Sequence, residues 1–152
     1  RHSSPELDAL GVEVVDGVDI DDPATIRALP DRLTDRKIDL LINNAGVGSW
    51  RSDDLLEDQT LEEVLLQFRV NAIGPVMVTQ ALLPLLSDHA RVGIVTSRMG
   101  SIADNTSGGA YGYRMSKAAV NAAGRAMSRQ ARAVTAIRVM VWNFMGVVYP
   151  FE

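Results

Sequence analysis

The chain lacks cysteine and contains only two histidines among its 152 residues. Without cysteine it can form no disulfide, no thiolate nucleophile and no Cys-ligated zinc site. Two histidines are also too few for a His-rich metal site. We therefore predict that the protein binds no metal.

Basic charge is in short supply, with 15 Lys and Arg against 19 Asp and Glu and a net charge of −4. Proteins that bind nucleic acid or an anionic membrane surface usually carry an excess of basic residues. This chain has none, so both kinds of partner are disfavoured. No run reaches about 18 consecutive apolar residues, and no secretory signal opens the chain. We expect a protein without a membrane span, located in the cytoplasm.

The length of 152 residues is typical of one domain, and a hydrophobic content of 47% suffices for one core. We predict a single domain over residues 1–152. The chain begins with Arg1 rather than Met, which is expected either of a processed protein or of a fragment whose start lies upstream.

Strand-like and helical patterns alternate along the chain. Valine-rich or nearly continuous apolar runs predict strands at residues 11–20, 38–42, 92–96 and 137–142. Helical spacing predicts helices at residues 24–35, 60–86 and 110–133. This alternation predicts an α/β fold, in which a doubly wound parallel sheet carries helices on both faces in three α/β/α layers.

Capping signals sharpen the helix boundaries. Asp22 is placed to cap the first helix with Pro23 in its first turn, whereas Pro30 weakens the middle of that helix. Thr60 and Glu63 form a capping-box pattern at the start of the second helix. These signals predict where the helices begin more firmly than where they end.

Tyr113 and Lys117 lie four residues apart near the start of the third helix, hence on one face and one turn apart. An ammonium group lowers the pKa of a neighbouring phenol from about 10, which suits proton exchange with an alcohol or carbonyl oxygen. A partly buried tyrosine beside a surface lysine explains the same spacing without any function. On the spacing alone, both interpretations stay open.

Further polar residues follow predicted strands or interrupt a helix. Ser97 ends a strand, where its hydroxyl can donate to a substrate oxygen or simply stabilise a turn. Asn71 lies within a helix four residues before Pro75, which has no N–H to donate to the Asn71 carbonyl. That carbonyl can hold a water, or the site can be a packing kink. The small residues 43–46 let a ligand approach the backbone. An ordinary loop without a binding function has the same composition.

Together these segments resemble the short-chain dehydrogenase/reductase family. Residues 43–46 match its Asn-Asn-Ala-Gly motif, and its catalytic tetrad is matched in order and approximate spacing by Asn71, Ser97, Tyr113 and Lys117. The stretches 97–102 and 108–117 look like the C-factor-like, sniffer-type carbonyl reductase branch. The resemblance extends from about residue 12 to residue 141 and implies a Rossmann-like fold.

The resemblance implies hydride transfer between a nicotinamide cofactor and a carbonyl or secondary alcohol. Tyr113 would be the general acid, and Lys117 would lower its pKa and hold the nicotinamide ribose. Ser97 would polarise the carbonyl, and Asn71 would hold a water through its backbone carbonyl. The cofactor-binding residues that the resemblance implies are Asp19, Ile20, Asn44, Ala45, Gly46, Tyr113 and Lys117.

The chain departs from the family at both ends. It contains no Gly-rich turn of the Thr-Gly-x-x-x-Gly-x-Gly kind, and Phe144 and Met145 stand where the family has a Pro-Gly pair. We therefore expect an incomplete Rossmann-like domain, lacking the N-terminal Gly-rich βα unit and the C-terminal part. The alternative interpretation is a catalytically inactive fragment that acts as an assembly or regulatory module.

The resemblance also bears on the cofactor and on partners. Arg1 is a weak sign of a 2′-phosphate, so NADP is slightly favoured over NAD. The expected partners are a small-molecule carbonyl or alcohol substrate and further copies of the chain, because the family's corresponding helices pair in dimers and tetramers. The identity of the substrate cannot be read from the residues.

Overall fold

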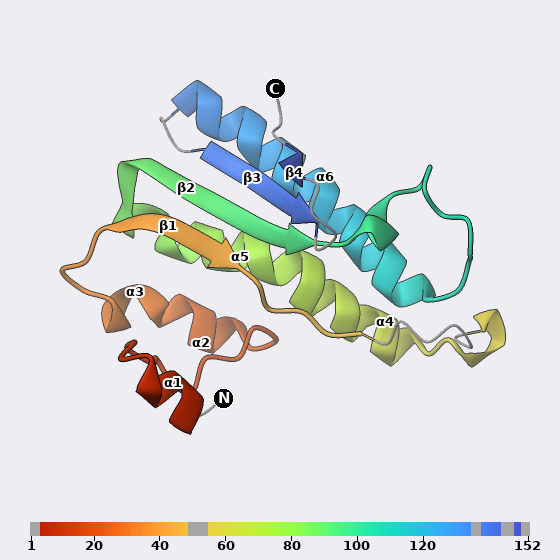
Figure 1. Cartoon of the computed structure of the whole chain (residues 1–152), viewed down its shortest axis with the longest axis horizontal. Helices are drawn as coiled ribbons and strands as arrows, with labels where there is room; N and C mark the ends of the chain where they lie inside the picture. Colours follow the sequence, from red (N-terminus) through yellow and green to blue (C-terminus); the bar gives the residue numbers. More distant parts are fainter. Residues whose placement is uncertain (1–3, 49–54, 135–137, 144–147, 150–152) are drawn as a thin grey trace.

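The sheet runs through the centre of the computed structural model, which describes residues 4–48, 55–134, 138–143 and 148–149. Its strands are hydrogen-bonded in chain order (Figure 1). They are β1 (Ile38–Asn43), β2 (Leu86–Thr96), β3 (Arg138–Asn143) and the short β4 (Val148–Tyr149). The first three are mutually parallel and β4 is antiparallel to β3. The parallel sheet with connecting helices confirms the predicted α/β class.

Helices precede and connect the strands, with α6 packed against β3 and α2 and α3 packed against α5 (Figure 1). In chain order the helices are α1 (Pro5–Ala9), α2 (Pro23–Arg27), α3 (Leu29–Arg32), α4 (Leu61–Phe68), a π-helical turn η2 (Arg69–Ile73), α5 (Gly74–Leu82) and α6 (Tyr111–Val134). Short 3-10 turns are η1 (Leu56–Asp58), η3 (Leu83–Leu85) and η4 (Arg98–Gly100).

The core has two parts. In the first, Val92 and Ile94 of β2 are fully buried against Val120 of α6. In the second, Ile26 and Leu29, which keep the predicted helical spacing, pack against α5. Together these contacts fix α5 and α6 to the sheet and so determine where the loops at the carboxyl ends of β1 and β2 lie.

The predicted caps are confirmed. The Asp22 carboxylate accepts a hydrogen bond from the Ala24 N–H at 2.8 Å, with Pro23 as the first residue of α2. The Thr60 hydroxyl accepts from the Glu63 N–H at 3.3 Å and lies 2.9 Å from the Glu63 carboxylate. These bonds satisfy N–H groups that the first turn of a helix leaves without an internal partner.

The prediction of a strand at residues 11–20 is wrong. This segment has no regular strand in the structure, and Gly17 adopts a φ of +70°, which an extended strand does not allow. A strand forms only where a neighbour accepts and donates its ladder hydrogen bonds. The valine pattern alone carried the prediction, and no neighbouring strand pairs with this segment among the described residues.

Two predicted helices differ in detail from those observed. The helix expected at residues 24–35 is split at Ala28 into α2 and α3, because Pro30 has no N–H to donate to the preceding turn. The helix expected at residues 60–86 bends through η2 instead of breaking at Pro75, and ends before Leu86. Because β2 begins at Leu86, it is six residues longer at its start than the predicted strand.

Candidate active site

The four residues matched to a catalytic tetrad lie together beyond the ends of β1 and β2. Ser97 follows β2 directly, while Tyr113 and Lys117 occupy the first two turns of α6. Asn71 comes from η2, the turn between α4 and α5. A Cβ atom added to Gly46 would lie 3.4 Å from Asn71 Oδ1 and 3.7 Å from Lys117 Nζ, so both side chains border the loop after β1.

The Asn71 side chain is 1% exposed and joins three segments. Its Oδ1 accepts from the Val47 N–H at 2.7 Å, and its Nδ2 donates to the Val47 carbonyl at 2.7 Å. Nδ2 also donates to the Ser116 hydroxyl at 3.0 Å. The amide group of Asn71 therefore fixes the loop after β1 to the start of α6, a role that its position four residues before Pro75 does not reveal.

Lys117 is unusually buried for a lysine, with 4% of its surface exposed. Its ammonium group donates to the Val95 carbonyl at 3.1 Å and lies 5.6 Å from the centre of the Tyr113 ring. Burial lowers the pKa of Lys117, because desolvation penalises the charged form. The ammonium is thus anchored to β2 and faces the aromatic ring of Tyr113.

The Tyr113 phenol is hydrogen-bonded to the Ser97 side chain. Burial raises the pKa of Tyr113, and the hydrogen bond with Ser97 partly offsets this rise. The expectation that Lys117 lowers the pKa of Tyr113 is therefore wrong for this structure, since desolvation dominates. At neutral pH the phenol keeps its proton and can donate it.

Close packing around Tyr113 requires glycine in the loop after β1. Gly48 has a φ of +140°, and a Cβ atom there would lie 2.7 Å from Tyr113 Cδ2 and 2.8 Å from Gln67 Oε1. Such distances are shorter than van der Waals contact, so any side chain at Gly48 displaces Tyr113 or Gln67. The loop after β1 therefore helps to set the position of the tyrosine ring.

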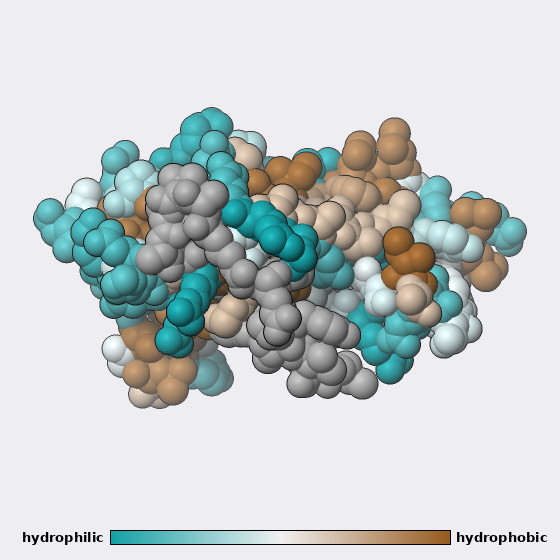
Figure 2. Space-filling view, turned by 90° about the horizontal axis from the view of Figure 1, so that it is seen from above, coloured by the Kyte–Doolittle hydropathy of each residue, from teal (hydrophilic) through white to brown (hydrophobic). Residues whose placement is uncertain are grey.

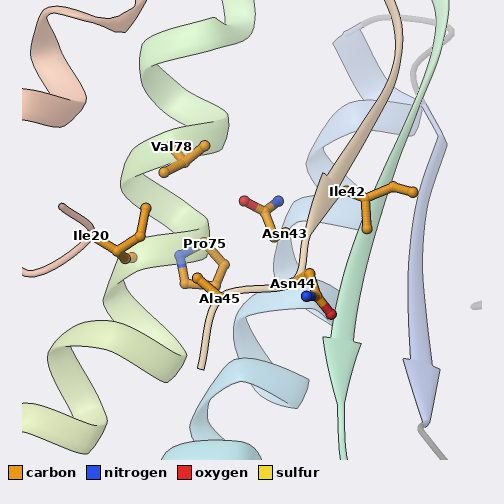
Figure 3. A pocket seen from close by; sticks show the side chains of 8 residues that line it. Ile20, Ile42, Asn43, Asn44, Ala45, Pro75 and Val78 are labelled. Atoms are coloured by element: carbon orange, nitrogen blue, oxygen red, sulfur yellow. The ribbon is translucent and has the colours of Figure 1, made fainter. Parts of the chain in front are cut away.

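A pocket adjoins this cluster on the side of α5. Ile20, Pro75 and Ala45 lie close together, and Asn43 points from β1 toward α5 (Figure 3). The full lining consists of Ile20, Ile42, Asn43, Asn44, Ala45, Gly74, Pro75 and Val78. Apolar walls with a few amide groups suit a flat heteroaromatic ring.

The structure places the predicted cofactor-binding residues of the loops in three different surroundings. Ile20, Asn44 and Ala45 line this pocket, and Gly46 adjoins the catalytic cluster. Asp19 is exposed and does not line it. Its carboxylate instead accepts from the Asp21 N–H at 2.9 Å, so that it stabilises the turn before α2.

Two buried residues near the site, Asn43 and Ser116, were not among the predicted site residues. Asn43 is buried and its Nδ2 donates to the Thr79 hydroxyl at 3.2 Å, which ties β1 to α5. Ser116, fully buried, donates to the Tyr113 carbonyl at 2.8 Å. The one available signal was the alternation of side chains along β1, which turns Asn43 inward and Asn44 outward.

Two negative findings concern the described part of the chain alone. Within it, no three His, Asp or Glu side chains are grouped so that they could hold a metal ion. None of its helices combines the length and hydrophobicity that a membrane crossing requires.

Comparison with known proteins places this arrangement in a family. A family model described as enoyl-(acyl carrier protein) reductase matches residues 2–141. C-signal of Myxococcus xanthus is 50% identical over 110 residues, which cover 70% of this chain and 64% of C-signal. The family-model match extends through the loop after β1, η2 and the first turns of α6.

Solved structures agree with the fold. The carbonyl reductase Sniffer of D. melanogaster superposes with a TM-score of 0.77 at 26% identity, over 91% of this chain and 63% of Sniffer. An NADPH-bound carbonyl reductase from chicken fatty liver has a TM-score of 0.73 at 30% identity, over 87% of this chain and 59% of that chain. The chain thus spans 59–64% of the length of these three relatives. It belongs to the short-chain dehydrogenase/reductase family.

Proposed function

We propose that this chain carries the catalytic part of an NAD(P)-dependent oxidoreductase. The reaction would be hydride transfer between a nicotinamide cofactor and a carbonyl or secondary alcohol, with Tyr113 as general acid in reduction and general base in oxidation. The single observation that carries the proposal is the hydrogen-bonded pair of Ser97 and Tyr113, with the buried Lys117 ammonium facing the same ring.

The protein groups have separate roles in this proposal. Tyr113, whose ordinary pKa of 10.0 is raised further by burial, is protonated at neutral pH and would donate a proton to a carbonyl oxygen. Ser97 is hydrogen-bonded to Tyr113 and would orient that oxygen and polarise the carbonyl. Lys117 keeps a positive charge beside the phenol, where it would stabilise negative charge that develops on the oxygen.

The residues present fit the adenosine end of a dinucleotide. The pocket beside α5 offers the apolar surfaces of Ile20, Pro75 and Val78 to a ring, and the amides of Asn43 and Asn44 lie at its wall. Gly46 leaves the space between this pocket and Lys117 without a side chain. When bound, the dinucleotide would supply the hydride, and the protein would supply position and electrostatics.

The finer assignments are proposals of the same kind. NADP is favoured over NAD, because the chicken carbonyl reductase contains NADPH. A small carbonyl compound is the proposed substrate, and residues 1–152 would form one partial domain of a cytoplasmic protein. The cofactor and the substrate class are supported by similarity to carbonyl reductases rather than by a contact in this chain.

We also propose association of the chain with further copies of itself, as a dimer or tetramer. Leu61 and Leu65 of α4 are 75% and 45% exposed, which is unusual for leucine on a helix that packs against α6. Seen from above, hydrophobic residues are interspersed with hydrophilic ones at the right-hand end of the molecule (Figure 2).

The substitution Tyr113→Phe tests the reaction. It removes the phenolic hydroxyl while keeping the ring, so we expect carbonyl reduction with NADPH to fall by about 100-fold or more. Tyr111→Phe is the matched control, because Tyr111 lies two residues earlier on α6 and is 37% exposed. Equal activity in both variants would contradict the role of Tyr113. Absence of NADPH binding in calorimetry would contradict cofactor use by this chain and would favour the alternative of an assembly module.

A further inference from the structure

Arg69, the first residue of η2, reaches a turn that lies 48 positions earlier in the sequence. Its Nε donates to Asp21 Oδ1 at 2.5 Å and its Nη2 to Asp21 Oδ2 at 3.2 Å. This two-point geometry is more specific than a single contact between charges. The hydrogen bond from Arg69 also lowers the pKa of Asp21, so the carboxylate is ionised at neutral pH.

The turn that Arg69 contacts is ordered by its own hydrogen bonds. Asp19 Oδ1 accepts from the Asp21 N–H at 2.9 Å. The Thr25 hydroxyl donates toward the carbonyls of Asp19 and Asp22 at 2.7 and 3.0 Å. These bonds tie residues 19–22 together, so a bond to Asp21 also bears on the position of Ile20.

Ile20 is the member of this turn that lines the pocket beside α5. A Cβ atom added to Gly74 would lie 2.3 Å from Ile20 Cγ2, so the isoleucine side chain packs directly against the start of α5. In Figure 3 Ile20 lies on the far side of Pro75 from β1. The turn is thus attached to the η2–α5 segment at two points, Arg69–Asp21 and Gly74–Ile20.

The same π-helical turn also carries Asn71, whose amide holds the loop after β1 and the start of α6. Arg69 contacts the turn before α2, whereas Asn71 contacts the loop after β1 and the start of α6. A π-helical turn changes the angular spacing of side chains along a helix, and such turns are frequent at functional sites. In this protein η2 links the wall of the pocket to the catalytic cluster.

We propose that Arg69 is a positioning residue for the pocket, and that its ion pair with Asp21 holds Ile20 in place for the adenosine end of a dinucleotide. This inference rests on the proposed function. Because Arg69 contacts the turn and is itself exposed, the ion pair contributes to cofactor binding and leaves the chemical step unchanged.

A double-mutant cycle measured by calorimetry with NADPH tests the inference. Arg69→Gln and Asp21→Asn are each expected to weaken NADPH binding by up to about 5-fold, the upper end of the range for a partly exposed pair. The double variant is expected to bind no more weakly than either single variant, because both remove the same interaction. Exchanging the charges, with Arg69→Asp and Asp21→Arg together, is expected to recover most of the affinity. At saturating NADPH, kcat stays at the value of the unaltered chain.

The matched control is Arg36→Gln, which breaks another exposed ion pair, Arg36 with Glu13, away from the pocket. This variant is expected to bind NADPH as the unaltered chain does. Equal affinity in Arg69→Gln and Arg36→Gln, or additive losses in the double variant, would overturn the role of Arg69 while leaving the proposed function intact. Failure of the unaltered chain to bind NADPH would overturn both.

Discussion

The catalytic cluster and the pocket beside it are built in different ways. Asn71 and Lys117 are almost completely buried, and each side chain bonds to backbone atoms of another segment. Asn44, Ala45 and Gly46, on the cofactor side, are exposed. Substitutions of Asn71 or Lys117 should therefore change the stability of the fold, whereas those of the exposed Asn44 and Ala45 should change ligand binding with little effect on stability.

Two adjacent asparagines show the same contrast at the scale of one residue. Asn43 ends β1 with its side chain turned inward to Thr79, whereas Asn44 begins the loop and is exposed. The residue type and the surrounding motif are alike, so the difference arises from the alternation of side chains along a strand. A motif therefore identifies a segment, and strand geometry then assigns each of its residues to structure or to ligand binding.

The largest expected effect comes from Asn71→Leu. The substitution leaves the Val47 N–H, the Val47 carbonyl and the Ser116 hydroxyl without their partner. We expect a loss of about 3 kcal/mol in the free energy of unfolding, since each unsatisfied buried polar group costs about 1–3 kcal/mol. Urea denaturation followed by circular dichroism measures this loss.

Asn44→Ala is the comparison for Asn71→Leu. Because Asn44 is exposed, we expect its substitution to change the free energy of unfolding by less than about 0.5 kcal/mol. Similar losses in the two variants would contradict the distinction between a buried cluster and an exposed pocket rim.

Gly48→Ala should have an intermediate effect that is specific to Tyr113. The new methyl group would meet the Tyr113 ring and the Gln67 amide at less than van der Waals distance. We expect a loss of about 1–3 kcal/mol in stability, together with a shift of the Tyr113 ring resonances in NMR spectra. Gly17→Ala introduces a side chain at a φ of +70° with nothing within 4 Å, so it should lose about 1 kcal/mol from backbone strain without moving those resonances.

The smallest expected effect is a change in the pKa of Tyr113. Ser97→Ala removes the hydrogen bond that offsets burial, so we expect the pKa of Tyr113 to rise further above its ordinary value of 10.0. The difference in tyrosinate absorbance between the protein and its Tyr113→Phe variant isolates this group. A lower pKa of Tyr113 in Ser97→Ala would contradict the assigned contact.

The raised pKa of Tyr113 also predicts how stability depends on pH. Above pH 10.0 the folded protein retains a proton that the unfolded chain has lost. The free energy of unfolding therefore falls as pH rises from 10.0 toward the pKa of the folded state. Tyr113→Phe removes this contribution, so the decline in stability measured by denaturant titration is expected to be smaller in that variant.

Local patterns in the sequence predicted much of the fold and the catalytic cluster. The apolar run at residues 38–42 became β1, and the spacing of Tyr113 and Lys117 placed both side chains toward one site. Helix caps at Asp22 and Thr60 formed as expected. Such features are determined within a few residues by helical and strand periodicity and by backbone hydrogen-bonding needs.

Contacts between distant segments needed the tertiary structure. The valine-rich segment 11–20 reads as a strand, yet a strand also requires a neighbour to pair with. The bonds of Asn71 to Val47 and Ser116, and of Arg69 to Asp21, join residues 24 to 48 positions apart. Periodicity carries no information about such pairs. The sequence by itself determined which groups could perform chemistry, and packing alone decided which of them are buried, bonded and brought together.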